Sequence, residues 1–296
     1  MDADLCPDFA SLGLDPAEVT RVELIHRKHG NHLYRVRCDA QPYVLKRFGD
    51  PAQATEVQSY TLLQNLGVPT LPVCGQGWDA LLLEDLASSS VWRLAEIVDV
   101  ERSETGAAIA RWYLALHSAG QKLLADSATV PAFLRREVDA LNAETIIETG
   151  ERLELAGDPV WRLAADHIEP IKQAMRSLPE TLNYNDFYWT NLALSRSESP
   201  LRAIVFDYHL LGIGLRYSDC RNVVGSLGER AAMAFWETYG PVDEREQLLD
   251  GPTSVLYALF VASHRPGFPS WTQGCLQSVE NGELKRSLQQ TLEITG

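Results

Sequence analysis

The sequence has little of what marks secreted, membrane-spanning or nucleic-acid-binding proteins. It has only five cysteines among 296 residues, widely spaced and without a C-x-x-C pair, which argues against a disulfide framework and a zinc site. Its longest apolar run, residues 255–262, is too short to cross a bilayer, and its first residues lack the basic and apolar segments of a signal peptide. The net charge of -14 opposes binding to nucleic-acid phosphates. We therefore expect a reduced, cytoplasmic protein that binds neither a membrane nor nucleic acid.

The composition is otherwise that of a globular protein with a substantial core. Hydrophobic residues make up 45% of the chain and charged residues 22%, which are ordinary values for a folded protein. The length corresponds to about two domains. Strand-like patterns stop near residue 87, and helix-like patterns dominate after it. We expect one lobe over residues 1–87 and a second over residues 88–296.

The first lobe is expected to be a small antiparallel sheet with one helix. Apolar and polar side chains alternate along its first half, as they do in half-buried strands separated by turns. Residues 51–66 place apolar side chains at every third position, the spacing of a helix face. The expected strands are 20–25, 33–38, 42–48, 71–73 and 80–83.

Lys46 and Glu56 stand out within this lobe. Lys46 interrupts an apolar strand, and Glu56 is the only charged residue of the helix that follows. Because successive side chains of a strand point to opposite faces, either Lys46 or Arg47 must face inward. A buried ammonium group needs a partner, and Glu56 is the candidate. The alternative is a solvent-facing lysine on an edge strand.

A turn with one glycine separates the first two expected strands. It spans residues 27–32 and contains Gly30 followed by Asn31. Its backbone N–H groups could cover the phosphates of a nucleotide. The simpler alternative is an ordinary hairpin turn.

Three polar residues, Asp186, Asn191 and Asp207, stand in the otherwise apolar or turn-forming stretch 181–208. Two short buried strands joined by a hairpin turn would bring Asn191 close to Asp207, with Asp186 on the loop that leads in. A carboxylate and an amide are hard oxygen ligands suited to Mg²⁺, and a second carboxylate can accept a proton from an attacking hydroxyl. The alternative is a capped turn and a polar strand end that only terminate structure. The expected strands are 192–194 and 203–206.

This stretch resembles the catalytic core of protein kinase-like phosphotransferases, in particular the aminoglycoside phosphotransferase and choline kinase group. The resemblance lies in the order of its parts: the motif D-x-x-x-x-N, then a hairpin, then two apolar residues, an Asp and an aromatic residue. The resemblance implies a two-lobed α+β protein kinase-like fold, with a small antiparallel sheet lobe carrying one helix and a larger, mainly helical lobe. It implies that Asp186 is the catalytic base and that Asn191 and Asp207 are magnesium ligands. Tyr184 and Asn185 stand where the group commonly has His-Gly.

The same resemblance implies a nucleotide site in the first lobe. Lys46, paired with Glu56, would bind the phosphates of ATP. Gly30 and Asn31 would lie over those phosphates. Glu84 and Leu86 would meet the adenine through their backbone, at the hinge between the lobes.

The second lobe is expected to be mainly helical. A helix over 104–118 is expected to stop at Gly120, with His117 capping its buried end; a catalytic role for His117 is the alternative. Asp219 is expected to cap another helix. A helix over 131–149 would carry a stripe of glutamates that either holds a polycationic substrate or is merely solvated. The stripe comprises Glu137, Glu144, Glu148 and Glu151, and the remaining expected helices are 158–177, 229–239, 243–263 and 270–294.

These patterns together favour an ATP- and Mg²⁺-dependent phosphotransferase. The phosphate acceptor would be a hydroxyl of a small cytoplasmic alcohol, amino alcohol, sugar or aminoglycoside-like molecule. A nucleotide-binding regulatory protein of the same fold without catalytic activity is the alternative. A helical scaffold that binds no nucleotide is a third class, and it predicts no thermal shift with Mg·ATP.

Overall fold

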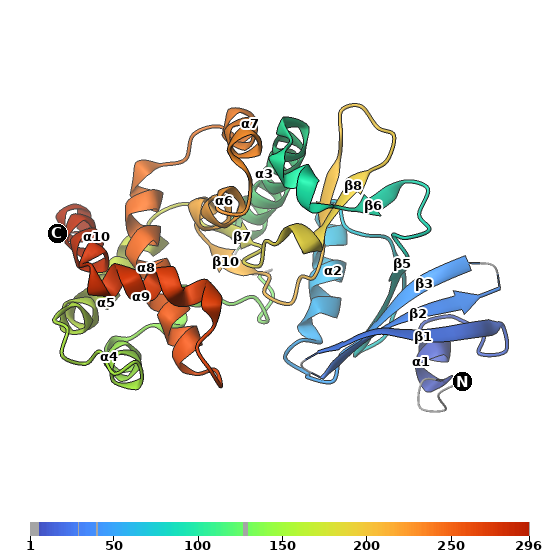
Figure 1. Ribbon diagram of the computed structural model, residues 1–296, viewed down its shortest axis with the longest axis horizontal. Coiled ribbons are helices and arrows are strands. Elements are labelled where there is room, and N and C mark those ends of the chain that lie inside the picture. The colour runs from blue at the N-terminus through green and yellow to red at the C-terminus, as the bar shows by residue number, and fades with distance from the viewer. Residues whose placement is uncertain (1–5, 29, 40, 127–129, 296) are drawn as a thin grey trace. The chain divides into compact units, whose positions relative to one another are not determined.

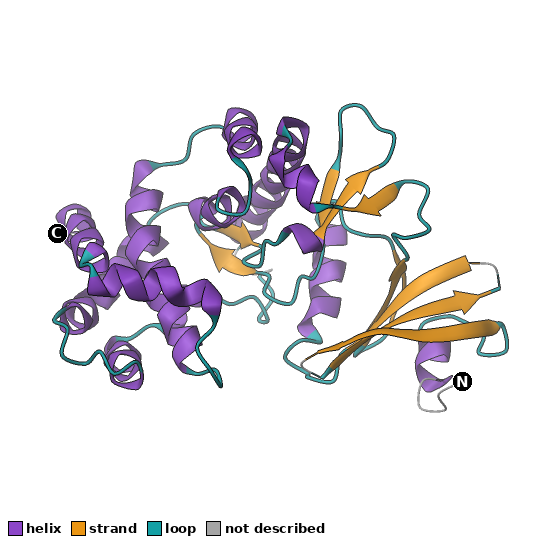
Figure 2. Cartoon of the chain, in the orientation of Figure 1, coloured by secondary structure: helices purple, strands orange, loops and turns teal. Residues whose placement is uncertain are grey.

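The computed structural model describes residues 6–28, 30–39, 41–126 and 130–295 (Figures 1 and 2). The chain forms two compact units. The first consists of residues 1–119, 184–211 and 222–240, and the second of residues 120–183, 212–221 and 241–296. The lobe boundary expected near residue 87 stays a prediction. None of the helices in the described ranges has the length and apolar character needed to cross a lipid bilayer.

The first unit contains a five-stranded antiparallel sheet in the order β1-β2-β3-β5-β4, with α2 beside it in Figure 1. Alternating side chains of the strands pack with Phe9 and Leu12 into a small core that includes Val36, Leu45 and Leu82. The expected sheet and its helix are confirmed, although β4 begins where its predicted strand ends. The elements are α1 (Cys6–Ser11), β1 (Val19–Lys28), β2 (Asn31–Cys38), β3 (Gln41–Arg47), α2 (Thr55–Asn65), β4 (Val73–Gln76) and β5 (Ala80–Glu84).

A second sheet in this unit contains the predicted hairpin. Strand β8 (Leu192–Ser195) pairs with β9 (Ala203–Val205), and Leu192 lies opposite Val205. The hairpin prediction is therefore confirmed. Strand β6 (Trp92–Leu94) pairs with the other edge of β8, and the sequence did not predict it because three residues are too few to show an alternating pattern. Helical elements that contribute to this unit are η2 (Ile97–Glu101), α3 (Ser103–Ala125), η5 (Trp189–Asn191), α6 (Arg216–Val224) and α7 (Glu229–Tyr239).

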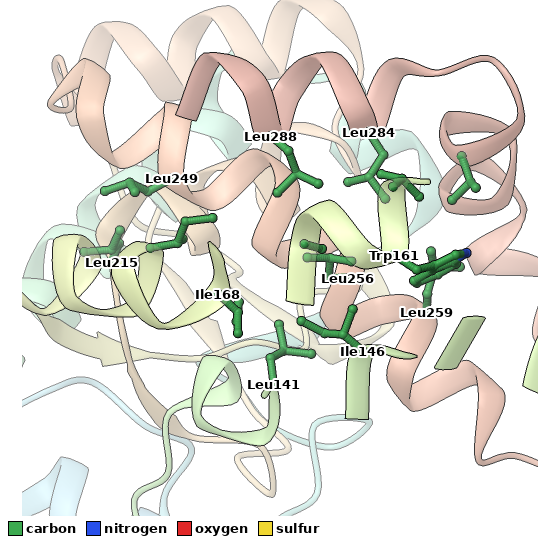
Figure 3. Packing of buried hydrophobic residues seen from close by; sticks show 14 of the residues in the cluster. Leu141, Ile146, Trp161, Ile168, Leu215, Leu249, Leu256, Leu259, Leu284 and Leu288 are labelled. Atoms are coloured by element: carbon green, nitrogen blue, oxygen red, sulfur yellow. The ribbon is translucent and has the colours of Figure 1, made fainter. Parts of the chain in front are cut away.

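In the described residues of the second unit, helices predominate and the strands are one antiparallel pair, β7 (Thr181–Asn183) and β10 (Gly212–Gly214). The core of this unit is a cluster of mainly aliphatic side chains that includes Trp161, and Figure 3 shows these side chains coming together from several helices. Burial of such side chains is the main favourable term in its stability. The elements are η4 (Glu137–Ala140), α4 (Ala143–Arg152), α5 (Val160–Arg176), α8 (Glu244–Ser263), η6 (Ser270–Thr272), α9 (Gln273–Glu280) and α10 (Glu283–Thr295).

The helix expected over residues 131–149 is wrong. Asn142 caps the start of α4 by accepting a hydrogen bond from the Thr145 N–H at 2.9 Å, so η4 is a separate short turn. Glu137 is therefore not on the same helix as Glu144, Glu148 and Glu151, and the expected stripe is not continuous. The single helix expected over 270–294 is also wrong, because it is divided into η6, α9 and α10.

Two expected helix caps are also wrong. Asp219 lies inside the first turn of α6, where it is buried, and does not precede that helix. His117 lies inside α3, and its Nδ1 is 2.6 Å from the Tyr239 hydroxyl. Helix α3 does not stop at Gly120 but continues to Ala125.

Gly120 is required by close packing within the second unit. A Cβ at this position would lie 2.2 Å from the Leu182 backbone nitrogen and 2.5 Å from Thr181 Oγ1. The backbone of β7 can approach α3 here only because this residue has no side chain.

We therefore expect Gly120→Ala to lower the free energy of unfolding by about 2–3 kcal/mol, the cost of overpacking a close contact. Gly274 in α9 is the matched control, because nothing lies within 4 Å of a Cβ placed there. Gly274→Ala should raise the free energy of unfolding by about 0.5–1 kcal/mol through helix propensity. Denaturant unfolding of the two variants measures both effects, and equal stability of the two would contradict this packing.

Candidate active site

Lys46, on β3, lies between two carboxylates of the first unit. Its Nζ is 2.6 Å from Glu56 Oε2 on α2 and 2.6 Å from Asp207 Oδ1, which follows β9. Only 1% of the Glu56 side chain is exposed, against 13% for Lys46. The structure thus contains the ion pair expected from the sequence and adds Asp207 as a second partner.

The charges of this cluster stabilise one another. Burial alone lowers the pKa of Lys46, but the Glu56 and Asp207 carboxylates outweigh it and hold that pKa above its ordinary value. Burial raises the pKa of Asp207, yet the hydrogen bond from His209 and the charge of Lys46 leave it well below its usual range. His209 Nδ1 lies 3.0 Å from Asp207 Oδ1. Asp207 is therefore ionised across the neutral range.

Glu56 is the most deeply buried of the three residues Lys46, Glu56 and Asp207. Burial raises the pKa of its carboxyl group, and the Lys46 ammonium opposes that rise. Its Oε1 has no hydrogen-bond partner among the described residues. A buried carboxylate with one oxygen unpartnered depends strongly on its cation. Lys46 is that cation.

The hairpin brings Asn191 next to the Asp207 loop, as the sequence predicts. The Phe206 N–H donates to the Asn191 carbonyl at 3.0 Å. The Asn191 Nδ2 group donates to the Tyr184 hydroxyl at 3.3 Å and to the Asp186 carbonyl at 3.5 Å. The amino group of the Asn191 side chain faces these acceptors, and among the described residues no hydrogen bond to its Oδ1 is found, so this oxygen can accept another contact.

Asp186 is partly buried on the loop between β7 and η5. Burial raises the pKa of its carboxyl group to about 6, and the nearby charge of His209 opposes that rise. Lys28, at the end of β1, is a further cation whose charge acts on Asp186. At neutral pH the carboxyl group is still mainly ionised and can accept a proton.

The β1–β2 turn lies close to the start of α2. Gly30 has a φ of 79°, a conformation that glycine adopts without strain. A Cβ added to Gly49 would lie 2.4 Å from the Gly30 carbonyl, so the two backbones are in close contact. The Asn31 Nδ2 group donates to Gln53 Oε1. Of the turn predicted over 27–32, residue 29 lies outside the described residues.

Glu84 and Leu86 lie at the end of β5. The Glu84 N–H donates to the Pro72 carbonyl at 3.2 Å, and the Leu86 carbonyl accepts from Arg196 at 3.3 Å. Both backbone groups are therefore already engaged by the protein. A nucleobase bound here would have to use the Glu84 carbonyl or the Leu86 N–H.

A cluster of buried aromatic side chains lies beneath these residues, and its role was not predicted from the sequence. Tyr208 packs edge-on against Tyr60 of α2, with ring centroids 4.8 Å apart. Trp112 of α3 packs against both Tyr184 and Tyr208. The sequence marks Tyr60 and Trp112 as apolar helix positions, which does not distinguish them from ordinary core residues.

Asp207 and Asn191 form a donor set that fits a magnesium ion. Mg²⁺ prefers hard oxygen ligands, and it is commonly held by one or two carboxylates with phosphate oxygens and water completing the shell. Here one carboxylate is ionised, and the amide has its Oδ1 left for such a contact. Glu56, Asp207 and His209 also place donor atoms within 4.8 Å of one another. The Lys46 ammonium is bonded to Glu56 and Asp207 and already neutralises their negative charge, as a metal ion bound among these three residues would.

The profile of the phosphotransferase enzyme family (APH) matches residues 21–249, which include every site residue described above. The chain belongs to this family. A search of curated proteins found no matching relative of this phosphotransferase-family chain.

Solved structures confirm the protein kinase-like fold of the phosphotransferase-family chain. A choline/ethanolamine kinase family protein from Mesorhizobium loti has a TM-score of 0.61 at 15% identity, covering 96% of this chain and 98% of its own. The ethanolamine kinase of Plasmodium vivax has a TM-score of 0.60 at 14% identity, covering 95% and 88%. A macrolide 2'-phosphotransferase from Brachybacterium faecium has a TM-score of 0.54 at 15% identity, covering 97% and 96%.

We expect Mg²⁺ alone to bind this site weakly, because Asp207 Oδ1 is already bonded to Lys46 and Asn191 is uncharged. Phosphate oxygens must supply the remaining negative charge and ligands. Titration calorimetry should therefore show saturable Mg²⁺ binding only when nucleotide is present. Asp207→Asn is the control and should remove the effect of Mg²⁺ on nucleotide binding. Tight binding of Mg²⁺ to the nucleotide-free protein would contradict this assignment.

Proposed function

We propose that the protein transfers the γ-phosphate of ATP to a hydroxyl group of a small molecule. The observation that carries this proposal is the bridging position of Lys46 between Glu56 and Asp207, on the same unit as Asp186 and Asn191. Membership of a phosphotransferase family supports the reaction class. Lys46 supplies positive charge, while Asp186 supplies a carboxylate that no described salt bridge neutralises.

In this proposal Lys46 binds phosphate oxygens of the nucleotide and remains anchored by Glu56. The ion pair keeps the ammonium charged and in place, so no reorganisation is needed when charge develops on the transferring group. Asn191 and Asp207 would hold Mg²⁺, and the ion would neutralise phosphate charge when bound.

Asp186 acts as the proton acceptor. As the acceptor hydroxyl oxygen forms a bond to the γ-phosphorus, the bond from that phosphorus to the leaving ADP oxygen breaks. The hydroxyl proton passes to the Asp186 carboxylate. Its partial burial suits this role, because a carboxyl group with a pKa of about 6 is more basic than an exposed one and is still mainly ionised at neutral pH.

The remaining residues would bind the nucleotide. Gly30 and Asn31 would cover the phosphates, since the turn that contains them joins β1 to β2 and Leu33 of β2 lies opposite Lys46. Glu84 and Leu86 would meet the adenine through the Glu84 carbonyl and the Leu86 N–H. Both assignments rest on the resemblance to the phosphotransferase family, and the positions of Gly30–Asn31 beside β2 and of Glu84 at the end of β5, in the sheet that carries Lys46, support them.

The acceptor is proposed to be a small alcohol, amino alcohol or sugar. Two similar structures are those of a choline/ethanolamine kinase family protein and an ethanolamine kinase, and a third is that of a macrolide phosphotransferase. A polycationic acceptor has less support, because the glutamate stripe expected from the sequence is divided between η4 and α4. Glu148 of that stripe is also paired with Arg152 at 2.6 Å.

Asp186→Asn should lower kcat by about 10²- to 10⁴-fold, the usual contribution of a positioned general base. The KM for ATP should change little, because the variant keeps Lys46, Asn191 and Asp207. Release of ADP measured over a panel of hydroxylated small molecules gives both parameters. Asp166→Asn, at an exposed position of α5, is the matched control and should behave as the wild type.

The outcome also separates an enzyme from a regulatory protein of the same fold. A regulatory protein would bind Mg·ATP, release no ADP with any acceptor, and show the same background hydrolysis in Asp186→Asn. An acceptor-dependent release of ADP that disappears in Asp186→Asn supports catalysis. Efficient phosphorylation of a kanamycin-type drug would instead show that the acceptor is an aminoglycoside.

A further inference from the structure

Two neighbouring side chains, Tyr184 and Asn185, connect the loop that carries Asp186 to both ends of the loop that carries Asp207. The Tyr184 hydroxyl donates to the Phe206 carbonyl at 2.5 Å, one residue before Asp207. The Asn185 Nδ2 group donates to the Leu210 carbonyl at 3.1 Å, three residues after it. The segment from Phe206 to Leu210 is therefore held at both of its ends.

The same hydroxyl also contacts the other proposed magnesium ligand. Asn191 Nδ2 donates to the Tyr184 oxygen at 3.3 Å. The hydroxyl thus accepts from Asn191 while it donates to Phe206. The buried Tyr184 oxygen is therefore hydrogen-bonded both to the Asn191 amide and to the backbone that precedes Asp207.

The burial and packing of Tyr184 fix the geometry of these hydrogen bonds. The side chain is fully buried, and its ring packs against Trp112 and Tyr208. A phenol hydroxyl in such surroundings has to find its partners within the protein. The ring cannot shift without disturbing that packing, so the position of the hydroxyl oxygen is defined.

The backbone provides an independent reason for such a connection. Asn185 has a φ of 65° and Asp207 a φ of 73°, both in the left-handed region that residues with side chains seldom adopt. Conformations of this kind persist when surrounding contacts determine them. The hydrogen bonds to Phe206 and Leu210 are such contacts, and they flank Asp207.

We propose that Tyr184 and Asn185 form a positioning clamp that sets the geometry of Asp207 and Asn191 toward the metal–nucleotide complex. Neither side chain is a ligand in this proposal. Each acts through the residue that it orients. The proposal rests on the proposed function, because it assumes that Asp207 and Asn191 receive the cation that accompanies the nucleotide.

The clamp accounts for the residues that stand in place of His-Gly. Asparagine at position 185 adopts the left-handed conformation more readily than most residues and adds a donor that glycine lacks. Tyrosine at position 184 reaches the Phe206 carbonyl with a donor and offers an acceptor to Asn191 at the same atom. The pair thus connects the Asp186 loop to the Asp207 loop through two side chains.

Three variants test the clamp. Tyr184→Phe removes the hydroxyl and keeps the buried ring. Asn185→Gly removes the donor and keeps a residue that adopts positive φ without strain. The third variant combines both changes. Tyr239→Phe is the matched control, because it also removes a buried hydroxyl, the one that contacts His117, at a place outside the proposed site.

The readout is the affinity for a non-hydrolysable ATP analogue with Mg²⁺ and with EDTA, measured by calorimetry. The ratio of the two affinities reports how well Asp207 and Asn191 hold the cation, and it does not require turnover. Tyr184→Phe should lower this ratio about 5- to 20-fold, because it leaves the Phe206 carbonyl and the Asn191 amide without the Tyr184 hydroxyl. Asn185→Gly removes an exposed hydrogen bond and should lower the ratio less, by about 2- to 5-fold. The affinity in EDTA should stay near that of the wild type, since Lys46 and Glu56 are unchanged.

Thermal midpoints separate positioning from simple stability. Tyr184→Phe and Tyr239→Phe should both lower the midpoint, but only Tyr184→Phe should lower the Mg²⁺-dependent ratio. If neither single variant nor the double variant lowers that ratio, the clamp is overturned and the bonds are merely structural. Asn185→Gly keeps the test decisive if Tyr184→Phe does not fold. A wild-type protein that binds no nucleotide in either condition would overturn the proposed function, and this inference with it.

Discussion

The Lys46 ammonium lies 2.6 Å from carboxylate oxygens on two distant parts of the chain, Glu56 on α2 and Asp207 after β9. Glu56 is almost wholly buried, and a buried carboxylate without a cation would be strongly destabilising. Lys46 therefore has to face this side of β3, and α2 and the Asp207 loop have to meet there. The remaining features of the proposed site lie around this charged group.

Aromatic side chains pack next to the charged cluster and hold its parts together. Tyr60 stands one turn along α2 from Glu56, and its ring packs against Tyr208, the residue that follows Asp207. Trp112 packs against Tyr184 and Tyr208 and donates to the Pro69 carbonyl at 2.8 Å. The chain segments that carry the two carboxylates facing Lys46 are thus joined by one apolar cluster of aromatic side chains. This cluster excludes water from one side of the charged groups, and the electrostatic interactions between those groups are stronger where water is excluded.

Much of this arrangement follows from residue types and their spacing. A lysine in an apolar strand requires a partner, and Glu56 was the only charge on the next helix, so the pair could be predicted. The hairpin that brings Asn191 to Asp207 could be predicted as well. The contact between Lys46 and Asp207 could not, because they are separated by 161 positions and nothing local to either residue indicates the other. Strand β6 and the break before α4 were missed because they depend on three-residue pairing and on a single capping asparagine.

The proposed function requires Asp207 and Asn191 to hold a cation when nucleotide is bound. A crystal structure with Mg²⁺ and a non-hydrolysable ATP analogue tests this directly. We expect Mg²⁺ about 2.1 Å from Asp207 and Asn191 oxygens, with the Lys46 ammonium on a phosphate oxygen and still bonded to Glu56. A structure in which the nucleotide is bound while Asp207 and Asn191 contact no cation would contradict it.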